Sequence, residues 1–172
     1  MLGQMDYSKE VLIPRKRNGE DGFDVLNPLY CYDGGQISFA GPSRDKNMVS
    51  VERAGVVINR GWIPYHMKDK RKRHWEQNSR HLVKVRGVWR RGKDVHDYKV
   101  PNNPDSNEWH NICCEDILSF WELPNQVDMK FFYFQQVDIE GDGGNELQQE
   151  GVDAPYPIPI TRDELINDQY NW

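Results

Sequence analysis

The chain has 172 residues, of which 37% are hydrophobic and 12% aromatic, and its formal net charge is −5. This length and composition predict one domain over residues 1–172 with an apolar core, and they exclude an intrinsically disordered chain. No apolar run approaches the roughly 18 residues that a membrane-spanning helix needs, so we expect no transmembrane segment.

Apolar runs bounded by turn residues predict a series of short strands in the first part of the chain. We expect a loop over residues 14–24 and a hairpin around Asp33-Gly34-Gly35, because Asp-Gly supplies the positive φ of such turns. Gly61 predicts a bulge or the close approach of another segment. The strand expected at 55–59 is rich in β-branched residues, which indicates burial on both faces. The expected strands cover residues 11–13, 25–32, 36–39, 48–51 and 55–59.

The second part of the chain combines fewer strands with short helical segments. The spacing of Ile117, Leu118 and Trp121, with Pro124 just beyond, predicts a short helix over residues 115–122. Many short strands with few helices predict a mostly β, single-domain antiparallel sandwich or barrel with one or two short helices. The other expected elements are a charged helix at 66–79, strands at 82–89 and 130–139, loops at 101–106 and 141–153, an extended segment at 155–160 and a helical turn at 162–170.

Charge is segregated along the sequence. Residues 66–93 contain 11 Lys and Arg against two acidic residues, whereas residues 94–172 contain 3 against 17. A solvated face is the simplest interpretation of the basic segment, followed by a contact with anionic lipid head groups or an acidic protein surface. We expect no nucleic-acid partner, because the acidic remainder would repel phosphate. The candidate contact residues are Lys70, Arg71, Lys72 and Arg73.

Residue clusters that carry chemistry are sparse. His110, Cys113 and Cys114 have the spacing of one helical face, but a zinc site needs a fourth ligand that the sequence does not offer. Residues 138–143 imitate the start of a calcium loop, yet the twelfth position is Gln149 instead of glutamate. Neither a nucleophile elbow nor a phosphate-binding loop is present. We therefore predict no enzymatic activity, no metal and no cofactor.

The first residues and the cysteines bear on targeting and on disulfide formation. The first ten residues have neither the apolar stretch of a signal peptide nor the Arg-rich pattern of a transit peptide, and we expect no cleaved presequence before Met1. The three cysteines, of which two are adjacent, make a poor disulfide framework. Small buried side chains with at most one bridge are the expectation for Cys31, Cys113 and Cys114.

Two stretches resemble motifs of one known family. Residues 57–64, Val-Ile-Asn-Arg-Gly-Trp-Ile-Pro, resemble the "VNRG(F/W)(V/I)P" strand of the surfeit-locus family, which includes the animal surfeit-locus protein and the yeast Shy proteins. Residues 100–110, Val-Pro-Asn-Asn-Pro-Asp-Ser-Asn-Glu-Trp-His, resemble its "PENNPxxNxWH" segment, and their order and separation also match. We call residues 59–64 the NRGWIP motif and residues 102–110 the NNP motif. The matching positions are Asn59, Arg60, Gly61, Trp62, Pro64, Asn102, Asn103, Pro104, Asn107, Trp109 and His110.

The resemblance implies a non-catalytic role in assembling or bracing mitochondrial cytochrome c oxidase, with the oxidase subunits as partners. It also implies a peripheral position at the inner membrane, because in the family this domain faces the intermembrane space between two transmembrane helices. Neither helix is visible in this sequence, and the family's membrane-proximal histidine has no counterpart near Trp172. The alternatives are a haem a chaperone and an unrelated lipid- or nucleic-acid-contacting module. A transient assembly factor and a permanent subunit both stay open.

Overall fold

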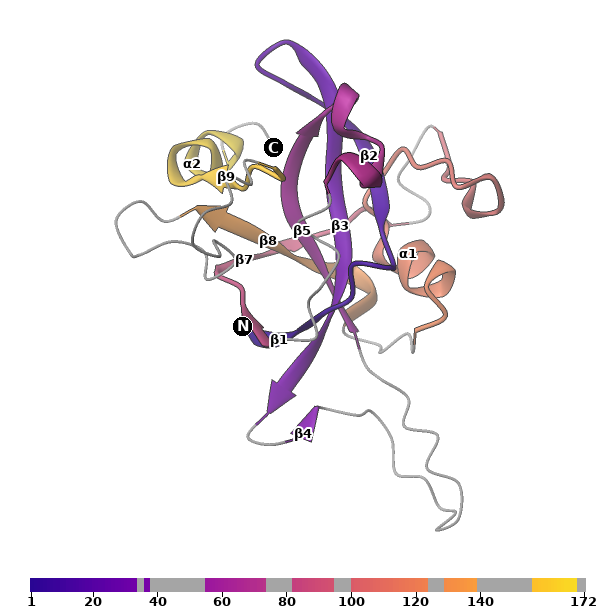
Figure 1. Ribbon diagram of the computed structural model, residues 1–172, viewed down its shortest axis with the longest axis vertical. Helices are drawn as coiled ribbons and strands as arrows, with labels where there is room; N and C mark the ends of the chain where they lie inside the picture. Colours follow the sequence, from indigo (N-terminus) through magenta and orange to yellow (C-terminus); the bar gives the residue numbers. More distant parts are fainter. Residues whose placement is uncertain are drawn as a thin grey trace.

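The computed structural model describes residues 1–33, 36–37, 55–73, 82–94, 100–123, 129–138 and 156–169. Strands dominate this part of the chain, which confirms the mostly β class with two short helices (Figure 1). The strands are β1 (Leu2–Met5), β2 (Val11–Arg17), β3 (Glu20–Asp33), β4 (Gln36–Ile37), β5 (Gly55–Pro64), β6 (Leu82–Lys84), β7 (Gly87–Arg91), β8 (Phe132–Asp138) and β9 (Ile160–Thr161). The helices are α1 (Cys114–Phe120) and α2 (Arg162–Gln169), and short 3-10 turns occur at Tyr65–Met67, Lys70–Lys72, Pro104–Ser106 and Met129–Phe131.

The described strands form one open mixed sheet, not the expected antiparallel sandwich or barrel. Its main path runs β6-β1-β3-β5-β8-β7, with β2 and β4 paired to β3 and β9 paired to β8. Most pairs are antiparallel, but β5 and β8 run parallel, as do β8 and β9. Parallel neighbours need a long crossover connection. The chain between β5 and β8, which includes β6, β7 and α1, provides one.

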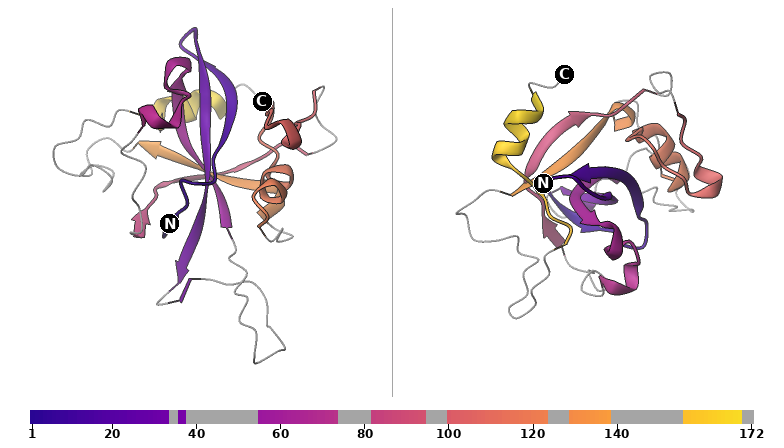
Figure 2. Two further views of the ribbon diagram at one scale, coloured as in Figure 1. Left: turned by 45° about the vertical axis from the view of Figure 1, so that its right-hand side comes forward. Right: turned by 90° about the horizontal axis from the view of Figure 1, so that it is seen from above.

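The two outer strands of that path are consecutive in the sequence. The expected single strand at 82–89 is wrong: β6 pairs with β1, and β7 pairs with β8 at the other end of the sheet. At Val85 and Arg86 the chain crosses from one edge of the sheet to the opposite edge, so the strand is interrupted there. Figure 2 shows that β7 and β8 run across the direction of β3 and β5, so the sheet is strongly curled.

The β2–β3 hairpin corrects the loop expected over residues 14–24. Strand β2 continues through Pro14, which a strand paired on one side only tolerates because its missing N–H can face outward. The turn is Asn18-Gly19, with φ values of 50° and 81°. Asn-Gly favours a two-residue hairpin turn of this kind. The hairpin at residues 33–36 is confirmed by the pairing of Asp33 with Gln36, although Gly34 and Gly35 lie outside the described residues.

Apolar side chains fill both faces of the sheet, and β5 is buried along its whole length, as its β-branched run predicts. Helix α1, expected at 115–122, is confirmed and covers one face. The core under α1 contains Val11, Ile13, Leu26, Val57, Trp109, Cys114, Ile117, Leu118, Trp121 and Tyr133. The core of the other face contains Met5, Tyr7, Leu29, Val56, Ile58, Val83, Val85 and Phe134.

The C-terminal segment lies against the end of β5, on the side of the sheet opposite α1 (Figure 1). Ile158 pairs with Trp62 through two backbone hydrogen bonds, as expected for an extended stretch at 155–160. Arg17 donates to Glu164 at 2.7 Å and to the Ile158 carbonyl at 3.0 Å, which holds α2 in place. None of the described helices is both long and apolar enough to cross a membrane.

The remaining expectations concern segments that are only partly described. The charged helix expected at 66–79 is wrong in its first part, where two 3-10 turns stand instead. Its second part, the strand at 48–51 and the loop at 141–153 lie outside the described residues.

Candidate functional site

The NRGWIP motif forms a bulge in the middle of the sheet. Two residues of β5 lie between the partners of Asp24 and Leu26, so the register shifts at this point. Gly61 adopts a φ of +125°, which glycine reaches without strain. The Asn59 side chain fixes the bulge, since it accepts a hydrogen bond from the Gly61 N–H at 3.1 Å and donates to the Asp24 carboxylate at 3.2 Å. The predicted bulge is therefore confirmed.

The same bulge brings the C-terminal segment close to β5. A Cβ on Gly61 would overlap the backbone carbonyl of Ile158. Both roles predicted for this glycine, a bulge and the close approach of another segment, are therefore confirmed.

Arg60 and Trp62 tie the NRGWIP motif to neighbouring segments. The Arg60 guanidinium is buried, donates to Asn27 at 3.1 Å and stacks on the Tyr7 ring at 4.6 Å. The Trp62 indole N–H donates to the Arg15 carbonyl of β2 at 3.0 Å. The motif side chains thus join β2, β3 and β5 from within the sheet.

The NNP motif is a self-supporting loop that leads into α1. The Asn102 side chain accepts from the backbone N–H groups of His110 and Asn111, and it donates to the Asp116 carboxylate at 2.9 Å. Asn103 pairs with Glu108 through the backbone, which closes the loop around the 3-10 turn that begins at Pro104.

The end of the NNP motif anchors the loop in the core under α1. Asn107 has a φ of +53° and accepts from the Trp109 indole N–H at 2.8 Å. Trp109 is buried and packs edge-on against Phe120. The geometry assigns most of this motif to holding the loop and α1 in position.

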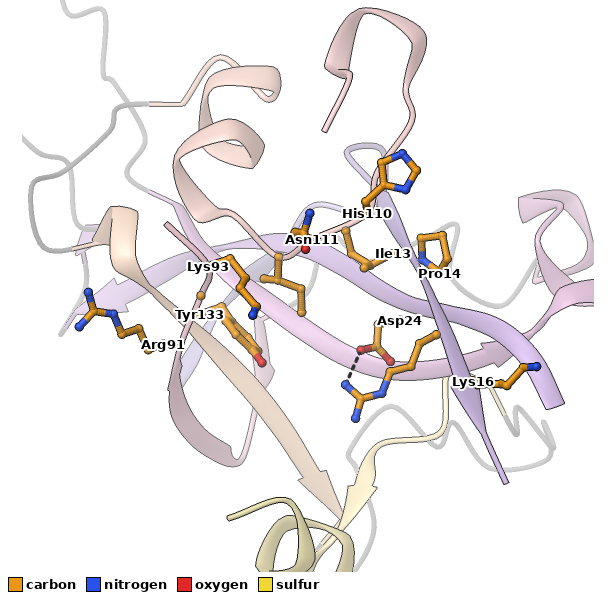
Figure 3. A pocket seen from close by; sticks show the side chains of 12 residues that line it. Ile13, Pro14, Lys16, Asp24, Arg91, Lys93, His110, Asn111 and Tyr133 are labelled. Atoms are coloured by element: carbon orange, nitrogen blue, oxygen red, sulfur yellow. Dashed lines mark hydrogen bonds and ion pairs between the residues drawn. The ribbon is translucent and has the colours of Figure 1, made fainter. Parts of the chain in front are cut away.

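A pocket of about 420 Å³ lies beside the end of the NNP motif (Figure 3). Asp24, the hydrogen-bond partner of Asn59, stands on one side, and His110, the last residue of the NNP motif, lies at its edge. The lining comes from β2, β3, the end of β7, the loop after the NNP motif and β8. The complete set is Ile13, Pro14, Arg15, Lys16, Asp24, Arg91, Gly92, Lys93, His110, Asn111, Ile112 and Tyr133.

The inner wall of the pocket holds two buried polar groups. Asp24 is 5% exposed, and burial raises the pKa of its carboxyl group, against the opposing effect of Arg15 at 3.4 Å and the hydrogen bond from Asn59. Tyr133 is 6% exposed, and burial raises its pKa to about 12. The tyrosine therefore stays a protonated donor at neutral pH.

In the structure, the basic residues of this segment differ in their exposure to solvent. Arg73 is completely buried, and its guanidinium makes two hydrogen bonds to the Glu10 carboxylate at 2.7 and 2.8 Å. Its interior position removes it from the proposed contact residues. Arg71 and Lys72 are exposed, while Lys70 is half-buried. We call residues 68–72 the basic turn.

The cysteines and His110 do not converge. Cys114 is buried at the start of α1, where burial and the adjacent Cys113 raise its thiol pKa to about 12, whereas His110 is exposed. No disulfide joins the three cysteines. Across the described ranges, no group of three or more His, Cys, Asp or Glu residues is arranged to hold a metal ion.

Both motifs can be recognised in the sequence, but the pocket cannot. The pocket side chains come from β2, β3, β7 and β8, which only the sheet topology brings together. One local signal was available: Asn18-Gly19 predicts the hairpin that pairs Arg15 with Gly22 and Ile13 with Asp24, and so makes Arg15 a diagonal neighbour of Asp24. No local sequence pattern predicts that Lys93 and Tyr133 line the pocket.

The fold and the site define a mostly β domain in which one curled mixed sheet carries a polar pocket beside two structural motifs. The family model of the SURF1 family matches residues 1–169, and the chain belongs to this family. Known members are membrane-associated assembly factors of cytochrome c oxidase and are not catalytic. Comparison with curated proteins finds no individual match.

Proposed function

We propose that this protein acts by binding, as an assembly factor or accessory subunit of mitochondrial cytochrome c oxidase, respiratory complex IV. The observation that carries the proposal is the family match over residues 1–169, which covers both motifs and all of the described strands. The partners are oxidase subunits, and the domain lies peripherally at the inner membrane on its intermembrane-space side. We propose that residues 1–172 act as one domain.

The surface supports a role in binding. The ion pair between Arg73 and Glu10 anchors the end of the basic turn, and Arg71 pairs with Asp69 at 2.7 Å. The exposed cations Arg71 and Lys72, with the half-buried Lys70 and with Tyr65, which is 64% exposed, fit an acidic protein face or anionic lipid head groups. Lys70, Arg71 and Lys72 are the proposed contact residues.

Depletion of the protein in its source cells tests the proposal. We expect the amount of assembled oxidase to fall while the other respiratory complexes stay unchanged, and wild-type protein supplied in trans to restore it. A variant carrying Asp105→Asn, an exposed change in the NNP motif, should restore it equally well. Normal oxidase levels after complete depletion would contradict the proposal.

A further inference from the structure

The pocket lined by Asp24, Lys93 and His110 is cationic. Among its described lining residues, Arg15, Lys16, Arg91 and Lys93 stand against a single carboxylate, that of Asp24. This carboxylate already accepts hydrogen bonds from Asn59 and Arg15. A concave surface with excess charge of one sign concentrates ions of the opposite sign. The pocket therefore attracts anions.

The cationic side chains differ in direction. Figure 3 shows the Lys93 ammonium pointing into the pocket toward Tyr133 and Asp24, whereas Arg91 and Lys16 point outward. In the described part of the chain, Lys93 has no ion-pair partner. Its backbone is fixed, because the Lys93 N–H donates to the Ile112 carbonyl at 2.8 Å.

After the Lys93 ammonium, the Tyr133 hydroxyl is the second group that indicates a bound ligand. Its ring is packed in the core under α1, and its hydroxyl faces the same space as Lys93 (Figure 3). Within the described ranges this hydroxyl has no hydrogen-bond partner. Among the described residues, Trp121 Nε1 is the fully buried side-chain polar atom without a partner, so the Tyr133 hydroxyl is accessible from the pocket and can donate to a bound acceptor.

We propose that this pocket binds a phosphate group, with Lys93 and Arg15 as charged contacts and Tyr133 as a neutral donor. A phosphate carries more than one negative charge and several acceptor oxygens, which matches two cations and a hydroxyl better than a single carboxylate does. The volume of about 420 Å³ also suits a small phosphorylated molecule or a lipid head group. The inference stands independently of the proposed role in oxidase assembly.

Calorimetric titration of the full chain with inorganic phosphate and with pyrophosphate tests the proposal. We expect saturable binding, and we expect both Lys93→Gln and Tyr133→Phe to weaken it about tenfold or more. The matched control is Lys84→Gln, which removes the same charge from an exposed position on β6 and should change affinity by less than about twofold. Tyr133→Phe keeps the buried ring, and its melting curve checks the fold.

Competition identifies the source of the phosphate. Vesicles of phosphatidylcholine with phosphatidic acid should displace pyrophosphate from the wild type if the ligand is a lipid head group. Failure of the vesicles to compete, with pyrophosphate still bound, assigns the pocket to a free phosphorylated molecule. Absence of saturable binding by either phosphate probe would overturn the proposal, as would equal weakening by Lys93→Gln and Lys84→Gln.

Discussion

Gly61 and Gly19 both have a positive φ, but they differ in their surroundings. A Cβ added at Gly19 would meet no described atom within 4 Å, whereas a Cβ added at Gly61 would overlap the Ile158 carbonyl. A side chain at Gly19 therefore meets backbone strain alone. At Gly61 it also displaces the C-terminal segment.

This contrast predicts the effect of matched alanine substitutions. Gly61→Ala should lower the free energy of unfolding by about 2–5 kcal/mol, because strain and overpacking add. Gly19→Ala should lower it by about 1–2 kcal/mol. Gly61→Glu should be worse still, since it adds a charge at a buried position. Thermal melts compare the variants, and equal melting temperatures for the two alanine variants would show that Ile158 does not constrain Gly61.

Asp24 gives the second prediction at this scale, a pH dependence of stability. Burial raises its pKa in the folded protein, so the folded state binds this proton more tightly than the unfolded state does. Stability should therefore fall as pH rises from the unfolded pKa near 3.8 through the folded value. Asp24→Asn imitates the protonated form and removes this component, while Arg15 and Arg17 still face the site.

Urea melts over a pH series measure the effect. The stability of Asp24→Asn relative to the wild type should increase as pH rises through that window. Asp21→Asn, at the exposed start of the same strand, is the control for loss of a carboxylate. An opposite trend, with the wild type gaining relative stability as pH rises, would mean that the carboxylate form of Asp24 stabilises the fold.

At the scale of elements, an ion pair fixes the basic turn to the loop between β1 and β2. Arg73 and Glu10 are 0% and 11% exposed in their side chains, so removing one partner leaves a charge with little access to water. Arg73→Met should cost about 3–5 kcal/mol of stability. Arg71→Met is the control, because its pair with Asp69 is exposed and its loss should leave the urea midpoint unchanged. A similar loss for both variants would contradict the buried role of Arg73.

The elements also show what the sequence can predict. Strand β8 and helix α1 follow from local runs and spacing of apolar residues, and each was predicted within a few residues. The β-branched run at 55–59 predicts the first half of β5, which continues to Pro64. The break between β6 and β7 was not predicted, because Val83 and Val85 continue an alternating pattern up to the point where the chain changes edges. Local pattern carries no information about that change of partner.

The candidate site could also be predicted only in part from the sequence. The two motifs were visible in the sequence, and the structure confirms the bulge at Gly61. The pocket was not predictable, because Asp24, Lys93 and Tyr133 meet only through pairings between distant strands. The burial of Arg73 within a highly charged run was equally hidden, since its partner Glu10 is 63 positions away.

At the scale of the whole molecule, the basic turn should control attachment to an anionic surface. Replacing Lys70, Arg71 and Lys72 together by Gln should weaken binding to vesicles that contain phosphatidylserine by about tenfold or more. Cosedimentation measures this, with phosphatidylcholine vesicles as the uncharged control. Binding of the wild type should also weaken as salt rises, because screening shortens the range of these charges. Unchanged binding across the salt series would return the basic turn to a solvated face.

We propose that this SURF1-family domain works in contact with cytochrome c oxidase. The most direct measurement is native gel electrophoresis of gently solubilised mitochondrial membranes, with mass spectrometry of each band. We expect the protein to co-migrate with the mature oxidase or with its assembly intermediates. Recovery of the protein only in fractions free of oxidase subunits, at low salt, would contradict it.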